Sequence, residues 1–231
     1  MIALNNVSLL KPGFRERPPI LQNASVVFGS KERVGIYAMP GSGKSSLARL
    51  LAGIDQPDVG TIRREGRVSW PIGFAGFLHP NLTVHENINN FARLVGVEPE
   101  AVIVFCREVF GLEYAPSKVM QDLSPTQRAL LAYACSLSID GPATWIADET
   151  ITVGEPADRA ACDAILAERL KIGGLVFLSR NIRQLATYCD RFLVLLNRRL
   201  VPCADLAVAQ EALELSKLTP QELDMEMANH V

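Results

Sequence analysis

The chain contains 231 residues, of which 48% are hydrophobic and 21% are charged, a balance that is typical of a folded globular protein and excludes a disordered chain. Its 23 Lys and Arg residues nearly offset 25 Asp and Glu residues, so the charge gives no reason to expect a nucleic acid as partner. No apolar run reaches the ~18 residues that cross a bilayer, and no signal-peptide pattern opens the chain, which predicts a cytoplasmic protein.

The first third of the chain predicts several strands followed by one helix. Apolar, β-branched segments separated by Pro- and Gly-rich loops indicate the strands. These predicted strands cover residues 2–10, 20–28, 33–38 and 61–70. Residues 44–52 predict a helix, because Leu47, Leu50 and Leu51 recur at helical spacing. Gly53 then follows as a stop signal.

The middle of the chain predicts helices, and the last third predicts strands alternating with helices. Residues 84–94, 99–110 and 125–137 indicate three helices, which we interpret as a helical subdomain inserted between strand-rich regions. The alternation that follows favours a parallel sheet covered by helices. Its predicted strands are 144–147, 175–179 and 192–196, and its predicted helices are 156–170 and 182–188. Residues 203–231 predict a helical tail with a capping-box pattern at Thr219-Pro220-Gln221-Glu222.

The sharpest motif lies between a predicted strand and a predicted helix. It matches the phosphate-loop pattern G-x-x-x-x-G-K-[ST] except that Ala replaces the first Gly. Gly41 and Gly43 let the backbone curl so that successive N–H groups point at an anion. Lys44 supplies a positive charge for the phosphates, and Ser45 offers a hydroxyl to Mg²⁺. The residues that we predict to bind the nucleotide here are Ala38, Met39, Pro40, Gly41, Ser42, Gly43, Lys44, Ser45 and Ser46.

Ala38 is a mild departure from that pattern. Its methyl group would strain the backbone only if the loop required a positive φ at this position. The alternative interpretation of the motif is a Gly-rich turn that binds no ligand. The strand before the motif and the helix after it argue against that alternative.

Two adjacent carboxylates, Asp148 and Glu149, end an apolar predicted strand. Acids at the carboxyl edge of a parallel sheet face the ligand crevice. We expect Asp148 to hold Mg²⁺ through water and Glu149 to orient or deprotonate the attacking water. By itself the pair also fits a solvated acidic loop. Together with the phosphate loop, it predicts a nucleoside triphosphatase fold.

A third segment, DLSPTQR at residues 122–128, leads into a predicted apolar helix. It resembles the signature segment of ATP-binding cassette (ABC) ATPases, whose usual form is Leu-Ser-Gly-Gly-Gln. Other segments resemble the ATPase subunits of bacterial capsular and lipopolysaccharide-type polysaccharide exporters. These segments are residues 50–62, 66–76, 79–83 and 86–88. The resemblance covers about residues 1–200.

The resemblance implies an α/β phosphate-loop NTPase fold of the ABC type. Such a fold has a core with a parallel sheet, an N-terminal antiparallel β-subdomain and an inserted helical subdomain. The chain would form a single domain. Within it, residues 1–74 and 139–202 would form the nucleotide-binding core, residues 75–138 the helical subdomain, and residues 203–231 a C-terminal helical tail.

The resemblance also implies ATP and Mg²⁺ as cofactors and two kinds of protein partner. Two ATP-binding subunits, identical or different, would enclose two ATP molecules. Each site would combine the phosphate loop of one subunit with the signature segment of the other, in which Ser124 and Gln127 are retained. A helix of an integral membrane permease would enter a cleft of the helical subdomain and hold the chain at the inner membrane. The implied function is export of a polysaccharide or related glycoconjugate.

Several residues depart from the family pattern. Pro125 removes an N–H donor from the signature turn, and Thr126 adds a β-branched side chain where a close backbone approach is expected. Arg180 stands where the family has a histidine that contacts the γ-phosphate. It can donate hydrogen bonds or stabilise charge, but it cannot accept a hydrogen bond. The chain also has no Gln between Gln56 and Gln121, where the family has one. We therefore expect ATP binding with reduced hydrolysis.

Two alternatives stay open. The chain could be a regulatory or scaffolding nucleotide-binding subunit that pairs with an active paralogue and hardly hydrolyses ATP. It could also be a soluble phosphate-loop kinase, although the signature segment and the position of Asp148 and Glu149 argue against this. The aromatic residue that stacks on adenine in the family would lie near Phe14, but the sequence does not place it.

Overall fold

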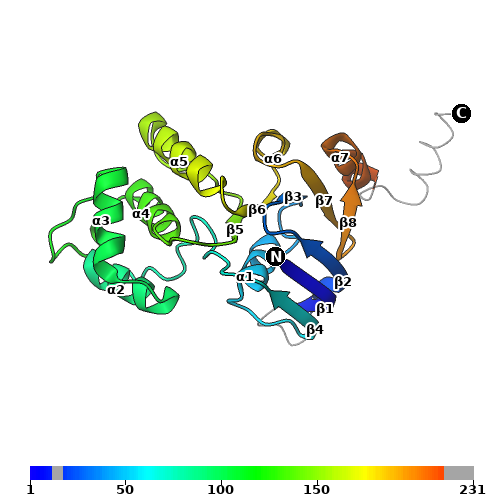
Figure 1. Ribbon diagram of the computed structural model, residues 1–231, viewed down its shortest axis with the longest axis horizontal. Coiled ribbons are helices and arrows are strands. Elements are labelled where there is room, and N and C mark those ends of the chain that lie inside the picture. Colours follow the sequence, from blue (N-terminus) through cyan, green and yellow to red (C-terminus); the bar gives the residue numbers. More distant parts are fainter. Residues whose placement is uncertain (12–17, 216–231) are drawn as a thin grey trace, which may run out of the picture.

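The computed structural model describes residues 1–11 and 18–215. Figure 1 shows a body of two sheets with their covering helices, and a separate group of three helices, α2 to α4, at the other end of the molecule. Within the two described ranges, no helix is both long enough and apolar enough to cross a bilayer. The capping-box pattern expected at Thr219–Glu222 lies outside the described residues.

The N-terminal sheet is antiparallel and has the strand order β2-β1-β4. Its strands are β1 (Ile2–Leu10), β2 (Pro19–Phe28) and β4 (Val59–Arg64). The prediction that β4 continues to residue 70 is wrong, because Gly66 takes a positive φ of 77° and turns the chain away. Beyond this turn, the N–H groups of Ser69 and Ile72 donate to carbonyl groups of Thr144 and Ile146 in the second sheet.

The second sheet has five strands in the order β5-β6-β3-β7-β8. Four of them are parallel: β5 (Thr144–Asp148), β6 (Gly174–Ser179), β3 (Arg33–Tyr37) and β7 (Arg191–Leu196). The edge strand β8 (Arg199–Cys203) is antiparallel to β7, and the sequence patterns do not predict it. Asn197 and Arg198, both at positive φ, form the two-residue turn before β8. Such turns usually contain Gly, and its absence conceals the hairpin.

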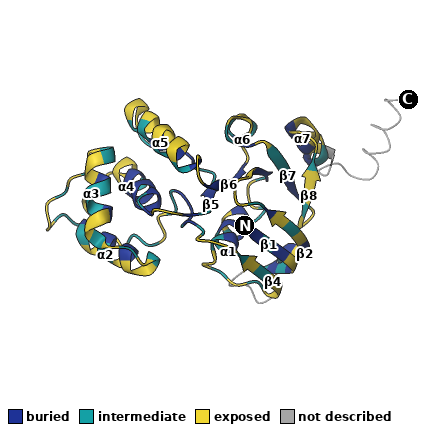
Figure 2. Ribbon diagram, in the orientation of Figure 1, coloured by how far each residue is buried: buried dark blue, intermediate teal, exposed yellow. Residues whose placement is uncertain are grey.

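Helices cover both faces of the five-stranded sheet. Helix α1 (Lys44–Ala52) contributes to an apolar core shared with the antiparallel sheet. The opposite core includes residues of α5 (Pro156–Arg169), α6 (Ile182–Tyr188) and α7 (Leu206–Leu215). Neighbouring residues of a strand point to opposite faces, so Ile36 packs in the first core and Tyr37 in the second. Figure 2 shows β5 and β6 mostly buried and much of the surface of α5 exposed.

The helical subdomain is formed by α2 (Val84–Val95), α3 (Pro99–Phe110) and α4 (Pro125–Leu137), with a short 3₁₀ turn at Met120–Asp122. The starts of these helices follow their sequence signals. Thr83 and Glu86 form a capping box at α2, and Pro begins both α3 and α4. Phe91, Val102 and Leu131 lie in a separate apolar core. The residue limits 75 and 138 that we assign to this subdomain stay a prediction.

Candidate nucleotide-binding site

The phosphate loop leaves the sheet at β3, between β6 and β7, and enters α1. Gly41 and Gly43 have φ values of 78° and 96°, the left-handed region that Gly adopts without a steric penalty. A Cβ atom on Gly43 would lie 2.3 Å from Cγ2 of Ile20, whereas a Cβ atom on Gly41 would meet nothing within 4 Å. The loop is therefore braced by β2 on one side and open at Gly41, where an anion can approach the backbone.

Ala38 fits its place without strain. It is fully buried, and its φ is not among the positive values of the described residues. Its N–H donates to the carbonyl of Ser179 at 3.2 Å, which continues the pairing of β3 with β6. The absence of the first Gly of the motif therefore leaves the loop intact.

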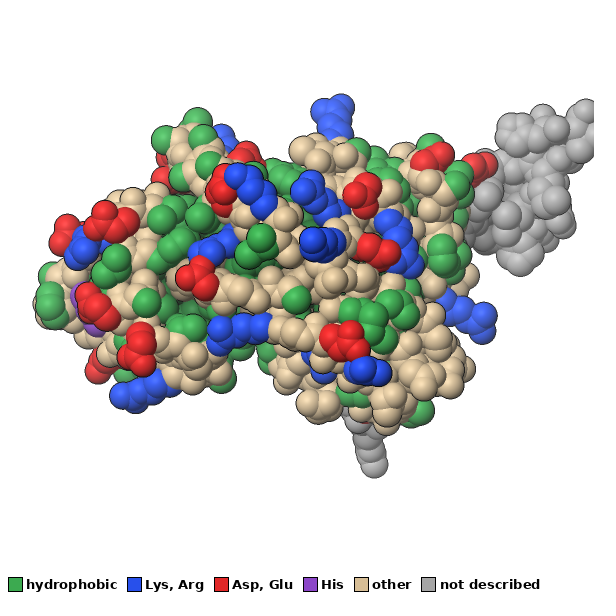
Figure 3. Space-filling model, in the orientation of Figure 1, with side chains coloured by type: hydrophobic (Ala, Val, Ile, Leu, Met, Phe, Trp, Pro, Cys, Tyr) green, Lys and Arg blue, Asp and Glu red, His purple; other side chains and the backbone are tan. Residues whose placement is uncertain are grey.

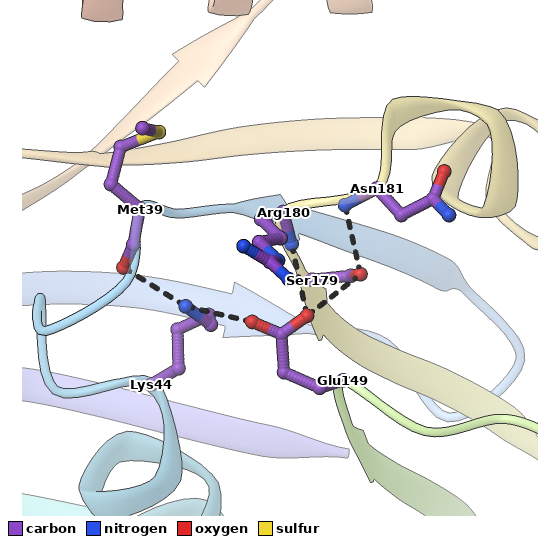
Figure 4. Close-up of polar contacts among 6 residues, drawn as sticks. All are labelled: Met39, Lys44, Glu149, Ser179, Arg180 and Asn181. Atoms are coloured by element: carbon purple, nitrogen blue, oxygen red, sulfur yellow. Dashed lines mark hydrogen bonds and ion pairs between the residues drawn. The ribbon is translucent and has the colours of Figure 1, made fainter.

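Lys44 is the first residue of α1, and its side chain is only 7% exposed. Its Nζ donates to the carbonyl of Met39 at 2.9 Å and forms an ion pair with Oε1 of Glu149 at 2.8 Å. Figure 4 shows the ammonium group between these two oxygens. The charge of Lys44 is thus held beside the loop that would receive phosphates.

Glu149 follows β5 and joins three loops through its carboxylate. Its backbone is left-handed, with a φ of 59°, and its N–H donates to the carbonyl of Leu178 at 2.8 Å. Besides the ion pair with Lys44, its Oε2 accepts hydrogen bonds from the Ser179 hydroxyl and the Arg180 N–H, each at 3.3 Å. The carboxylate therefore connects the loops after β3, β5 and β6 (Figure 4).

Asp148 and Ser45 present the oxygens that a magnesium ion prefers. The Ser45 hydroxyl lies close enough to the Asp148 carboxyl to favour its charged form. Oδ1 of Asp148 and Oγ of Ser42 are buried with no hydrogen-bond partner within residues 1–11 and 18–215. Burial raises the pKa of the Asp148 carboxyl, and the Ser45 hydroxyl lowers it in part. Hard oxygen ligands with unused acceptor capacity beside a phosphate loop fit Mg²⁺.

A hollow of about 570 Å³ opens above this network. It is lined by Pro40, Glu149, Arg180, Asn181 and Gln184, and Arg180 is exposed. The predictions omit Asn181 and Gln184. Asn181 caps α6, because its side-chain oxygen accepts a hydrogen bond from the Gln184 N–H at 3.3 Å. An Asn directly before a predicted helix is a sequence signal for such a cap.

Ser124 and Gln127 lie at the start of α4, and in the described part of the chain their hydrogen bonds do not reach the phosphate loop. They form a capping box: Oγ of Ser124 accepts from the Gln127 N–H at 3.1 Å, and Oε1 of Gln127 accepts from the Ser124 N–H at 2.9 Å. Pro125 is the first helical residue and Thr126 is exposed. Within one chain, the phosphate loop and the signature segment therefore lie at separate places, and each provides half of the expected site. Phe14, near the expected adenine contact, lies outside the described residues.

Comparison with known proteins agrees with this geometry. The family model described as ABC transporter matches residues 21–152. The chain belongs to the ABC transporter family. The ATP-binding protein BexA of Haemophilus influenzae is 32% identical to this ABC protein over 85% of this chain and 90% of BexA. The capsule polysaccharide export ATP-binding protein CtrD of Neisseria meningitidis serogroup B is 29% identical over 91% and 97% of the two chains.

Solved structures confirm the fold. An ATP-binding cassette dimer in a post-hydrolysis state with ADP and Pi superposes with a TM-score of 0.71 at 18% identity, covering 87% of this chain and 96% of that chain. A structure of the ATP-binding subunit of an ABC transporter superposes with a TM-score of 0.69 at 19% identity, covering 99% of both chains. The expected phosphate-loop NTPase fold, with its antiparallel sheet and its helical subdomain, is therefore confirmed.

Proposed function

We propose that this ABC protein is the ATP-binding subunit of a transporter that exports a polysaccharide or related glycoconjugate through a membrane permease. Two relatives support the substrate class: CtrD is named for capsule polysaccharide export, and RfbB of Klebsiella pneumoniae, 30% identical over 85% of this chain, for O-antigen export. The observation that carries the proposal is the meeting of Lys44, Asp148 and Glu149 at the phosphate loop.

The phosphate loop has the features needed to bind the triphosphate of ATP. Backbone N–H groups from Gly41 to Ser45 lie at the start of α1, where the helix dipole favours an anion. Lys44 adds its charge, and Ser45 and Asp148 would hold Mg²⁺. The bound Mg²⁺ would neutralise charge on the phosphates during transfer. The Asp148 oxygen that lacks a partner is the acceptor that supports this assignment.

Glu149 is the residue that we propose to act on the attacking water. In the nucleotide-free chain its carboxylate is paired with Lys44, and phosphates bound at the loop would compete for that ammonium group. Once released, the carboxylate stays anchored through the Ser179 hydroxyl and the Arg180 N–H. From this position it can accept a proton from water at the edge of the hollow.

We propose that hydrolysis is slow because the signature segment has few free donors. The capping box uses the N–H groups of Ser124 and Gln127, and Pro125 has none. Among residues 1–11 and 18–215, the Thr126 N–H is the amide of this turn that is left without a hydrogen-bond partner. In a dimer this turn would face the partner subunit's nucleotide and would stabilise its γ-phosphate only weakly.

The permease is proposed to dock in a groove between the nucleotide-binding core and the helical subdomain. This groove has a volume of about 380 Å³. Ile54 on the core side and Leu94 on α2 are 37% and 61% exposed beside it. Arg67 crosses the groove and donates to the carbonyl of Val95 at the end of α2. Exposed apolar side chains on both sides fit the apolar face of a short helix.

Calorimetry and an ATPase assay on the purified chain test the proposed function. We expect Mg-ATP to bind and Lys44→Ala to weaken that binding, while Lys171→Ala, which removes an exposed lysine, leaves it unchanged. The steady-state ATP turnover of the purified parent chain should lie below ~1 s⁻¹, the low end of ordinary enzyme rates. No heat of binding to the intact chain would refute the proposal.

The second candidate function is a nucleotide-binding regulatory subunit, and the few free donors of the signature turn favour it. The two functions differ in the transporter complex. With Glu149→Gln introduced in this chain alone, an exporting ATPase subunit predicts a loss of transport. A regulatory subunit beside an active paralogue predicts unchanged transport.

A further inference from the structure

The carboxylate of Glu149 has two kinds of partner, which differ in whether a nucleotide can displace them. Its Oε1 is paired with Lys44 of α1 at 2.8 Å, and phosphates bound at the loop would compete for that ammonium group. Its Oε2 accepts from the Ser179 hydroxyl and the Arg180 N–H, each at 3.3 Å. Neither of these two donors belongs to the phosphate loop. A bound triphosphate would therefore free Oε1 and leave Oε2 in place.

The end of β6 holds Glu149 at both its backbone and its side chain. The Glu149 N–H donates to the carbonyl of Leu178 at 2.8 Å, and the next two residues along the chain supply the donors to Oε2. Ser179 ends β6, which lies between β5 and β3 in the sheet, and it is fully buried. Lys and Arg side chains project from the surface of the molecule (Figure 3), where they can change direction. The close-packed interior instead fixes the Ser179 side chain.

The hydrogen bonds of Ser179 leave one direction for its hydroxyl proton. The hydroxyl oxygen accepts from the Asn181 N–H at 3.0 Å, and an N–H group can only donate. Because a serine hydroxyl carries a single proton, that proton points to Oε2 of Glu149 (Figure 4). Two hydrogen bonds in series therefore run from the start of α6 to the carboxylate.

We propose that Ser179 is a positioning residue for hydrolysis: it holds Oε2 of Glu149 so that Oε1 accepts the proton of the attacking water. This inference rests on the proposed function, in which Glu149 acts on that water. The proton moves to Oε1, and the water oxygen bonds to the γ-phosphorus of ATP. The bond from this phosphorus to the bridging oxygen breaks, and its electron pair stays on ADP. Ser179 donates its hydrogen bond throughout and transfers no proton.

A double-variant comparison tests this positioning role, with single-turnover phosphate release from saturating Mg-ATP as the measurement. Ser179→Ala should lower the hydrolysis rate by about 10–100-fold, because a misplacement of ~1 Å at a reacting group can cost 10²-fold. Its affinity for a non-hydrolysable ATP analogue, measured by calorimetry, should equal that of the parent chain. In the Glu149→Gln background, Ser179→Ala should have no further effect on the rate, since no proton-accepting carboxylate is left to position.

Ser136→Ala is the matched control for the loss of a buried hydroxyl. Ser136 is also fully buried and donates to the carbonyl of Ala132 at 2.8 Å, but it lies on α4. Ser179→Thr keeps the hydroxyl at a strand position that suits a β-branched residue, so it should retain hydrolysis. Ser179→Cys carries the test if the alanine variant does not fold, because a thiol fills the space but is a weak donor. Unfolding curves establish that each variant is folded.

Three results would overturn the proposal. Ser179→Ala could hydrolyse ATP at the parent rate, which would show that Glu149 needs no hydroxyl to hold it. The same change could slow Glu149→Gln as much as it slows the parent chain, which would show that Ser179 acts through the fold. The parent chain could bind ATP without any hydrolysis. In all three cases ATP still binds, which distinguishes them from a failure of the proposed function, in which the intact chain gives no heat of binding.

Discussion

Lys44 and Glu149 form an ion pair of 2.8 Å that links the start of α1 to the end of β5. Lys44 is nearly buried, so solvent screens this pair less than a surface pair. The carboxylate therefore satisfies the lysine where a phosphate is expected to do so. We propose that nucleotide binding and the release of Glu149 are coupled in one exchange of partners.

Glu149→Gln should raise the affinity of the isolated chain for a non-hydrolysable ATP analogue. The amide keeps the shape of the side chain but removes the negative charge that competes for Lys44 and repels phosphate. We expect an increase on the order of tenfold, measured by calorimetry. Glu155→Gln, which changes an exposed acid at the start of α5, is the control. Equal affinities for the parent and Glu149→Gln would contradict the exchange.

Lys44→Ala should weaken nucleotide binding by ~10–100-fold, the loss expected for a charge-assisted hydrogen bond or two. It also leaves Glu149 without its cation, so the variant should show a lower unfolding temperature in the absence of nucleotide. Lys44→Arg is the informative companion variant, because the larger guanidinium keeps the charge but not the compact geometry. Full affinity in Lys44→Ala would remove this lysine from the site.

Asp148→Asn should stabilise the nucleotide-free chain at neutral pH. Burial raises the pKa of Asp148 in the folded state, so folding favours the protonated carboxyl. The protonated carboxyl therefore stabilises the fold at low pH, and this stabilisation is lost as the pH rises through the folded-state pKa. The advantage of Asn should therefore be largest near pH 7 and shrink toward the ordinary Asp pKa of ~3.9. Thermal unfolding from pH 7 down to pH 4 measures it. An advantage that grows on acidification would contradict this assignment.

Thr126→Gly combined with Arg180→His should increase ATP turnover in the dimer. The first change opens the signature turn to a close approach, and the second restores a side chain that can accept a hydrogen bond. One recovered transition-state contact is worth ~10²-fold, while Gly costs α4 less than ~1 kcal/mol. Steady-state phosphate release by the parent dimer and by the double variant measures the effect, and Arg183→His on α6 is the control. Unchanged turnover would show that these residues do not limit hydrolysis.

Leu94→Glu should prevent association with the permease without changing ATP binding by the isolated chain. A charge on this exposed side chain would have to be buried against the apolar face of the docked helix, which is costly. Ile172→Glu is the matched control, because Ile172 is 66% exposed and does not line the groove. Co-purification of the complex measures the effect, and equal recovery of both variants would place the permease elsewhere.

Local signals in the sequence account for most of the fold. Pro99 and Pro125 mark helix starts, and Gly53 marks a helix end, so the predicted bounds of α1, α3 and α4 agree with the structure. The capping box between Ser124 and Gln127 is also visible as an S-x-x-Q spacing, although we assigned these residues to the nucleotide alone. The shared use of both side chains in the cap appears only in three dimensions.

Other features depend on tertiary contacts and have no local signal. The hairpin at Asn197 and Arg198 uses left-handed residues other than Gly. Ala38 needs no Gly because its φ is ordinary, which only the backbone reveals. The partners of Glu149 come from loops that are distant in the sequence but adjacent at the sheet edge. Gln184, which lines the hollow above the site, is likewise brought there by the fold.

The left-handed backbone of Glu149 has a consequence for directed evolution. A residue other than Gly held in this region carries a conformational penalty of ~1 kcal/mol or more. Glu149→Gly would relieve this penalty, but it would also leave the nearly buried ammonium group of Lys44 without its carboxylate, which costs more than is gained. Libraries selected only for heat resistance should therefore retain Glu149 in its unfavourable conformation, even when phosphate release is not selected.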